Sequence, residues 1–141
     1  MRSIIDVPVS YKTIILRTDF NVPLSHDNKI MDDTRIRASI PTIEYLMHQN
    51  AQVVIISHFG RPKAREDKYS MKLIRDRLSE LMNIDIKFID CDILNPNITD
   101  EIDQIQYGEV CILDNMRFYK EESSNDETFS KLLASLGNIY V

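Results

Sequence analysis

Short apolar runs rich in β-branched residues alternate along this chain with segments of helical periodicity, and this alternation limits its fold more than any other feature. Such runs indicate strands, and the helices between them indicate βαβ units and a parallel sheet. The second run, residues 53–56, has no polar residue at alternate positions, which is typical of a parallel strand covered on both faces. The five predicted strands occupy residues 13–16, 53–56, 86–89, 110–113 and 139–141.

The first predicted helix spans about residues 34–47. Asp32 and Asp33 precede it, at the positive end of the helix dipole. Pro41 lies inside it and lacks an amide hydrogen, so we expect it to kink or restart the helix. Cap signals locate the later helices: Ser70 and Asn83 around the second, Thr99 near a short third, and Ser124, Glu127 and Gly137 around the last.

These elements predict one doubly wound, Rossmann-like α/β domain with a parallel sheet and three α/β/α layers. The chain has 141 residues, the size of one compact domain, and 43% of them are hydrophobic, which supports a packed core. No repeat, low-complexity tract or Pro/Gly-rich linker divides it. The pattern does not give the order of the strands.

The composition excludes several classes of protein. A formal net charge of -5 leaves no overall basic field, which disfavours a nucleic-acid partner. No stretch approaches the roughly 18 apolar residues that a membrane span needs, and the N-terminus has no secretory apolar segment. Cys91 and Cys111 have no metal-site spacing and are expected to be reduced thiols. We expect a cytoplasmic protein.

Polar segments follow three of the predicted strands, where open parallel sheets bind their ligands. They are residues 18–23, 57–62 and 114–119. Arg35 and Arg37 lie in the first turn of a helix, where cations oppose the dipole, so their placement calls for a reason. The candidate site residues at this common edge are Asp19, Asn21, Arg35, His58, Arg61 and Arg117.

The chemistry of this set suits a small anion. Arginine donates hydrogen bonds as a planar fork that matches carboxylate and phosphate groups. His58 adds a donor or a positive charge, while Asp19 and Asn21 bind hydroxyls or orient the basic side chains. The sequence therefore predicts a pocket for a phosphorylated sugar acid.

Each segment also has a purely structural interpretation. These are an Asx turn at Asp19 and Asn21, a solvated helix face at Arg35 and Arg37, a loop held by Gly60 and Pro62, and a surface ion pair of Arg117 with Glu121 or Glu122. The joint occurrence of the segments favours a site.

Four of these segments resemble, in order and at compatible spacing, motifs of the N-terminal domain of phosphoglycerate kinases. They are residues 17–23, 35–38, 57–62 and 115–118, and residues 68–70, 133–137 and 140–141 are also similar to that family. Two departures are mild: Phe59 stands where the family usually has leucine, and Asp114 where it usually has glutamate.

The resemblance implies an enzyme of glycolysis, usually monomeric, that transfers a phosphoryl group between ATP and 3-phosphoglycerate, giving 1,3-bisphosphoglycerate. It implies that the basic side chains hold the carboxylate and phosphate of the acid. Arg35 would also act as a catalytic residue that stabilises charge on the phosphoryl group in transfer. The implied substrate-binding residues are Asp19, Phe20, Asn21, Arg35, His58, Phe59, Gly60, Arg61 and Arg117.

In that family a second, C-terminal domain binds Mg-ATP or Mg-ADP, and the two domains close around both substrates. This chain stops at Val141 and has neither a P-loop nor a GxGxxG element. We therefore expect residues 1–141 to be a partial N-terminal domain without the nucleotide-binding domain. It is expected to bind no cofactor or metal and to show no kinase turnover alone.

Two alternatives stay open at this point. A haloacid-dehalogenase-type phosphatase would also place an aspartate such as Asp19 after an apolar strand. That motif needs a second aspartate where Asn21 stands, together with an acidic cluster that binds magnesium. The other alternative is a stand-alone domain that binds phosphoglycerate-like anions without catalysis.

Overall fold

A five-stranded sheet forms the centre of the protein, and every strand pair in it is parallel. The computed structural model describes residues 4–27, 29–60, 69–90, 97–116, 131 and 133–141. The strand order is β3-β4-β2-β1-β5. The strands are β1 (Thr13–Arg17), β2 (Gln52–Ile56), β3 (Lys87–Ile89), β4 (Val110–Leu113) and β5 (Ile139–Tyr140).

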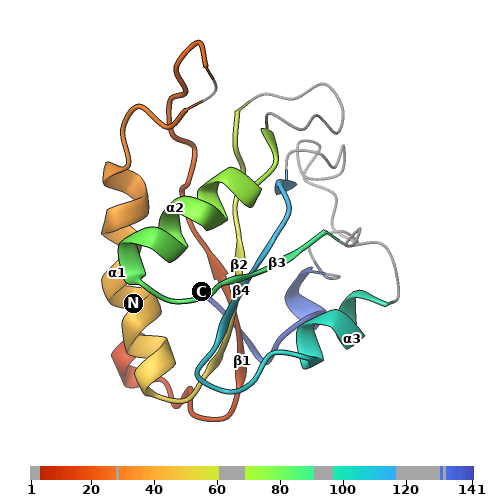
Figure 1. The fold of residues 1–141 in the computed structure, drawn as a ribbon. Coiled ribbons are helices and arrows are strands. Elements are labelled where there is room, and N and C mark those ends of the chain that lie inside the picture. The colour runs from red at the N-terminus through yellow and green to blue at the C-terminus, as the bar shows by residue number, and fades with distance from the viewer. Residues whose placement is uncertain (1–3, 28, 61–68, 91–96, 117–130, 132) are drawn as a thin grey trace.

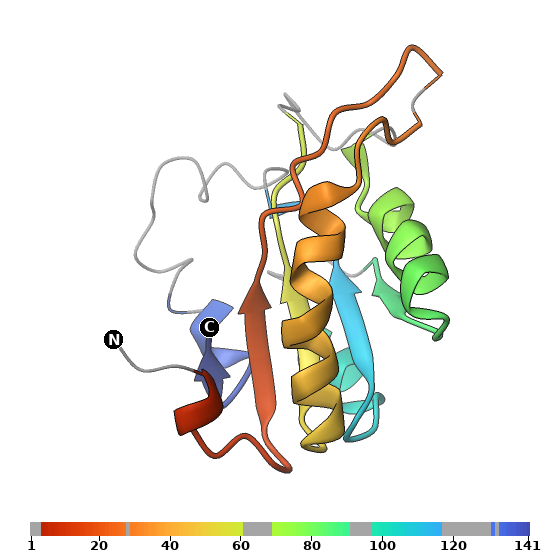
Figure 2. The same cartoon turned by 90° about the vertical axis from the view of Figure 1, so that its left-hand side faces the viewer.

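Helices cover both faces of the sheet, which confirms the predicted three-layer, doubly wound α/β architecture (Figures 1 and 2). On one face lie α1 (Thr34–His48) and α2 (Lys72–Met82). On the other lie α3 (Ile98–Asp103) and the helical residues 131 and 133–135. A short 3-10 helix, η1 (Ile4–Asp6), precedes β1.

The core is divided into two layers because successive strand residues point to opposite faces. In β2, all five residues are buried, since each face meets a helical layer. This burial on both sides explains why the strands read as unbroken apolar runs. The strand residues in the layer of α1 and α2 are Ile14, Leu16, Val53, Ile55, Val110 and Ile112, and those in the opposite layer are Ile15, Val54, Ile56, Ile89, Cys111 and Leu113.

Helix α1 runs without a break from Thr34 to His48, so the expectation that Pro41 restarts it is wrong. Pro41 cannot donate to the carbonyl of Arg37, one turn earlier. Both residues are exposed, so water can solvate this carbonyl in place of the missing bond. The apolar side of the helix, which carries Ile36 and Ile43, is fully buried and holds the helix together across this position.

Among the other helix signals, those at Asn83 and near Thr99 are confirmed. Asn83 ends α2 in the left-handed conformation, with a φ of 55°. Ser70 lies one residue before the N-cap position instead of in it, and its hydroxyl accepts a hydrogen bond from the amide of Lys72 at 3.2 Å. The short helix expected near Thr99 is α3. The capping box of Ser124 and Glu127 lies outside the described residues.

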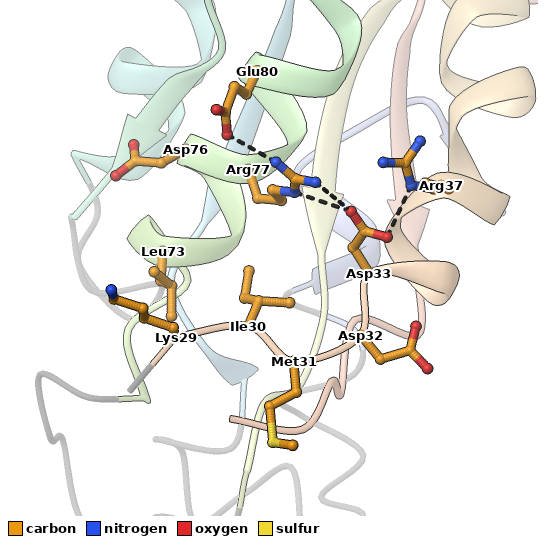
Figure 3. Close-up of a pocket in the computed structure, with 10 residues that line it drawn as sticks. All are labelled: Lys29, Ile30, Met31, Asp32, Asp33, Arg37, Leu73, Asp76, Arg77 and Glu80. Carbon is orange, nitrogen blue, oxygen red and sulfur yellow. Dashed lines mark hydrogen bonds and ion pairs between the residues drawn. The ribbon is translucent and has the colours of Figure 1, made fainter. Parts of the chain in front are cut away.

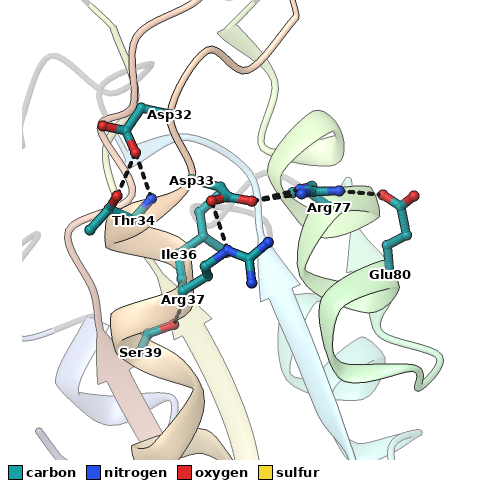
Figure 4. Close-up of polar contacts among 8 residues, drawn as sticks. All are labelled: Asp32, Asp33, Thr34, Ile36, Arg37, Ser39, Arg77 and Glu80. Carbon is teal, nitrogen blue, oxygen red and sulfur yellow. Dashed lines mark hydrogen bonds and ion pairs between the residues drawn. The ribbon is translucent and has the colours of Figure 1, made fainter.

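An ion-pair network joins the start of α1 to α2 (Figure 4). Asp33, directly before α1, accepts a hydrogen bond on Oδ1 from Arg37 Nε at 2.8 Å. Its Oδ2 accepts two more from Arg77 of α2, from Nε at 3.0 Å and Nη2 at 2.7 Å. Arg77 Nη1 also donates to Glu80 at 3.1 Å. Hydrogen bonds from the guanidinium groups of Arg37 and then Arg77 lower the pKa of Asp33 below its usual value.

Gly137 marks a close approach of the chain to β1. The helical residues end before it, as predicted, but its φ is not in the left-handed region. A Cβ atom here would lie 2.8 Å from Ile15 Cγ1 and 2.9 Å from the carbonyl oxygen of Thr13. The missing side chain thus lets Asn138 reach β1, where its amide donates to the Thr13 carbonyl at 2.8 Å.

Replacing Gly137 with alanine is expected to lower the free energy of unfolding by about 1–3 kcal/mol, because the methyl group overlaps β1. Urea denaturation measures this change. The control Ala134→Ser, at an exposed position nearby, is expected to stay within about 0.5 kcal/mol of the wild type. A stabilised Gly137→Ala protein would show that the reduced entropy of the unfolded chain outweighs the contact with β1.

Candidate functional site

The carboxyl ends of β1, β2 and β4 meet at one edge of the sheet, the upper edge in Figures 1 and 2. After β2 the chain passes to α2 on one face, and after β4 it passes to the helical residues on the other. Neighbouring strands whose connections leave to opposite faces define the crevice where doubly wound sheets bind ligands. The sequence-predicted segments flank this point.

Ser57 ties the loop after β1 to the end of β2. It is fully buried and follows β2 directly. Its hydroxyl donates to the carbonyl of Thr18 at 2.8 Å and accepts from the amide of Phe20 at 3.0 Å. These bonds satisfy backbone groups at a place where the two loops separate from the sheet.

Asn115, which follows β4 and is also fully buried, likewise forms hydrogen bonds to loop backbone groups. Its Oδ1 accepts from the amide of Phe59 at 3.0 Å, and its Nδ2 donates to the carbonyls of Phe59 at 2.6 Å and Tyr69 at 2.9 Å. The neighbouring Asp114 accepts from the amide of Met71 at 3.0 Å. The end of β4 therefore holds the loop after β2 and the approach to α2.

Asn21 links the first two loops. Its Oδ1 accepts from the amide of Gly60 at 2.9 Å, while its own amide lies 3.3 Å from Asp19 Oδ1. The Asx turn considered as a structural alternative is thus present, together with a contact between loops. Gly60 has a φ of 63°, and the ring of Tyr69 leaves no room for a side chain there.

Arg35 reaches this edge from the first turn of α1. Its Nη1 donates to the carbonyl of Asn21 at 2.8 Å and lies 3.2 Å from Asp19 Oδ1. The side chains of Arg35 and Asp19 are 54% and 61% exposed, so a ligand in solution can reach both. A cavity of about 290 Å³ adjoins them, lined in part by Thr18 and Ser39.

A larger cavity, of about 690 Å³, is lined by residues of the segment before α1, of α1 and of α2, and by none of the candidate site residues that the structure describes (Figure 3). It is bounded by the segment before α1 and by α2, and most of its charged groups pair with one another, as Asp33 does with Arg77. Neither Arg35 nor His58 lines it. We therefore place the candidate site at the strand ends.

The described part of the site brings six predicted residues together: Asp19, Phe20, Asn21, Arg35, Phe59 and Gly60. His58 is half-buried between Ser57 and Phe59 in the chain. The rings of Phe20 and Phe59 are buried in the core, and the hydrogen bonds of these two residues to Ser57 and Asn115 are made by their backbone groups. Arg61 and Arg117 lie outside the described residues.

Sequence reasoning did not single out Ser57 and Asn115, although both stood in the quoted motifs. A usable signal was present, because each is a small polar residue directly after or close after a buried apolar strand. A polar side chain buried at the end of an apolar strand is expected to form hydrogen bonds with buried backbone groups nearby.

Three further observations bear on chemistry. Burial raises the pKa of the Cys111 thiol to about 12, so it stays protonated and unreactive at neutral pH. Within the described residues, no group of three or more His, Cys, Asp or Glu side chains is placed to hold a metal ion. No helix in that same part of the chain is long and apolar enough to cross a membrane.

The fold and this edge define a doubly wound α/β domain with a polar candidate site at its switch point. The family model of the phosphoglycerate kinases matches residues 4–141. The chain therefore belongs to the phosphoglycerate kinase family, and the phosphatase alternative is set aside.

Curated relatives agree with this membership. A phosphoglycerate kinase of Aquifex aeolicus is 46% identical over 137 residues, which cover 96% of this chain and 34% of that protein. One of Wolbachia pipientis wMel is 48% identical over 130 residues, covering 92% and 32%. A cytosolic phosphoglycerate kinase of Nicotiana tabacum is 46% identical over 130 residues. The chain spans about a third of the length of these relatives.

Solved structures share the fold. The phosphoglycerate kinase of Pyrococcus horikoshii OT3 superposes with a TM-score of 0.87 at 33% identity, covering 99% of this chain and 36% of that one. The enzyme of Coxiella burnetii superposes with a TM-score of 0.85 at 29% identity, covering 97% and 33%.

Replacing Asn115 with alanine is expected to lower the free energy of unfolding by about 3 kcal/mol, because it leaves the amide and carbonyl of Phe59 buried without their partner. Chemical denaturation checks this value. Asn21→Ala serves as a control that removes one part-buried bond to Gly60, with an expected loss of about 1 kcal/mol. Equal losses for the two variants would contradict the role given to Asn115.

Proposed function

We propose that this chain binds 3-phosphoglycerate at the carboxyl ends of β1, β2 and β4, as the acid-binding part of a phosphoglycerate kinase. One observation carries the proposal: Ser57, Asn115 and Asn21 join three of the four family motifs into one hydrogen-bonded edge, and Arg35 of the remaining motif bonds to it. Membership of the family supplies the reaction class, the transfer of a phosphoryl group between ATP and 3-phosphoglycerate in glycolysis.

In this proposal the basic side chains share the two anionic groups of the acid. Arg35 and His58 lie on the described part of the edge, and Arg61 and Arg117 complete the set from segments outside it. Asp19 orients the Arg35 guanidinium and accepts a hydrogen bond from the hydroxyl of the acid. A preorganised guanidinium stabilises charge that develops on the transferred group, so Arg35 has the catalytic role.

Mg-ATP or Mg-ADP, in this proposal, binds outside residues 1–141, and the chain alone does not turn over. The threefold greater length of the relatives supports a second substrate site elsewhere in such proteins. The other acid is 1,3-bisphosphoglycerate, which presents the same phosphate at one end. A cytoplasmic location accords with the relative described as cytosolic.

Calorimetric titration of the chain with 3-phosphoglycerate tests the proposal. The variant Arg35→Met is expected to weaken binding by about tenfold or more, because a charge-assisted hydrogen bond to the ligand is lost. Arg75→Met is the matched control, since Arg75 bonds to the carbonyl of Ile86, just before β3 and at the opposite edge of the sheet. Its affinity is expected to stay within about twofold of the wild type.

Two outcomes would contradict the proposal. One is an absence of binding by the wild-type chain, and the other is equal affinity of the wild type and Arg35→Met. If the chain binds the acid and also phosphorylates it with added ATP, the acid-binding role stands and the proposed location of the nucleotide site is wrong. If it binds without turnover, the mass of the natural protein distinguishes the two roles. A much longer natural protein supports a kinase, and a natural protein of the length of this chain supports a stand-alone binding domain.

A further inference from the structure

We infer that Asp33 and Arg77 form a positioning pair that sets the place of Arg35 in the acid-binding site. Neither residue was among the predicted site residues, and neither lies at the strand ends. The inference deepens the proposed function and rests on it. It concerns how the first turn of α1 is fixed relative to the loops that Arg35 must meet.

The contacts of the Arg35 guanidinium are too exposed to fix it alone. Its pair with Asp19 joins two side chains that are each more than half exposed, and such pairs contribute about 0–1 kcal/mol. Arginine also has several rotatable bonds, so ordering its charged end carries an entropic cost. The position of the first turn of α1 therefore limits which contacts the guanidinium can reach.

Asp33 holds that turn with both its backbone and its side chain. Its carbonyl accepts the helical hydrogen bond of the Arg37 amide at 2.9 Å. Its carboxylate accepts from Arg37 on one oxygen and from two nitrogens of Arg77 on the other (Figure 4). The Asp33 side chain is only 19% exposed, which protects these bonds from solvent more than those of Arg35.

Helix α2, the partner of Asp33, is itself fixed to the site. Asp114, directly after β4, accepts from the amide of Met71 at the start of α2, and Asn115 bonds to the carbonyl of Tyr69. Arg77 lies farther along the same helix. A continuous set of bonds thus runs from the end of β4, through α2 and Asp33, to the turn that carries Arg35. Breaking it between α2 and Asp33 removes the polar contact that holds the first turn of α1 against α2, while the buried side of α1 stays packed on the sheet.

The sign of the expected effect separates this inference from simple electrostatics. Asp33→Asn removes a negative charge, and charge alone would make an anion bind more tightly. Loss of positioning makes it bind more weakly. Glu80→Gln removes the same charge from the same network and keeps an acceptor for Arg77, so it is the matched control.

The test compares the affinity for 3-phosphoglycerate, by calorimetry, of the wild type, Asp33→Asn, Arg77→Met and the double variant. Each single variant is expected to weaken binding about fivefold to tenfold, and the double variant no more than either, because both break one bond set. Glu80→Gln is expected to stay within twofold. Ile74→Val, a core change on α2, controls for lost stability: it is expected to lower the urea midpoint and leave the affinity within twofold.

A second measurement needs no ligand. The amide of Val22 shares a peptide group with the Asn21 carbonyl, to which Arg35 donates. Its NMR chemical shift is expected to move in Arg35→Met and to move in the same direction in Asp33→Asn, but not in Glu80→Gln.

The outcomes separate the two proposals. A wild-type chain that does not bind the acid overturns the proposed function. A wild type that binds, with Asp33→Asn binding as tightly or more tightly, overturns the positioning role. An additive double variant, or an unmoved Val22 resonance in Asp33→Asn, does the same.

Discussion

The loops at the carboxyl ends of the strands must leave the sheet without burying backbone amide and carbonyl groups that have no hydrogen-bond partner. This requirement is severe here because β2 and β4 are buried on both faces. Ser57 and Asn115 meet it, since each side chain replaces the sheet bonds that end where the loops diverge. The same bonds bring together the loops that carry the family motifs, so the bonds that complete the fold also assemble the candidate site.

The repeating pattern of the sequence was enough to predict the layers of the fold. Residues 13–16, 53–56 and 110–113 read as strands because burial on two faces demands unbroken apolar runs, and the structure places strands there. Strand order was out of reach, because it depends on which crossover reaches which neighbour and not on any local run. Pro41 does not restart α1, one of the two outcomes expected for it, since burial on the far side of α1 outweighs one lost hydrogen bond on its exposed side.

The candidate site also has a part that the sequence predicts and a part that it does not. Asp19, Asn21 and Arg35 could be named from chain position, because parallel strands send their ends to a common edge. That Arg35 donates to the carbonyl of Asn21, and that Asp33 reaches across to Arg77, could not be read from spacing. Asp33 and Arg77 are separated by 44 residues, and only the packing of α1 beside α2 brings them together. Polar pairs of this kind leave no periodic mark in a sequence.

The position of β5 has a consequence for the order in which the protein assembles. Among the described strands, β1 comes first along the chain and β5, which pairs with it, comes last, and the hydrogen bond between Thr13 and Asn138 spans 125 residues. Contacts of such long range delay folding, because a long loop must close before they form. On the ribosome, one edge of β1 therefore stays open for pairing until residues 139–140 emerge. During that interval the open edge is able to pair with a foreign strand.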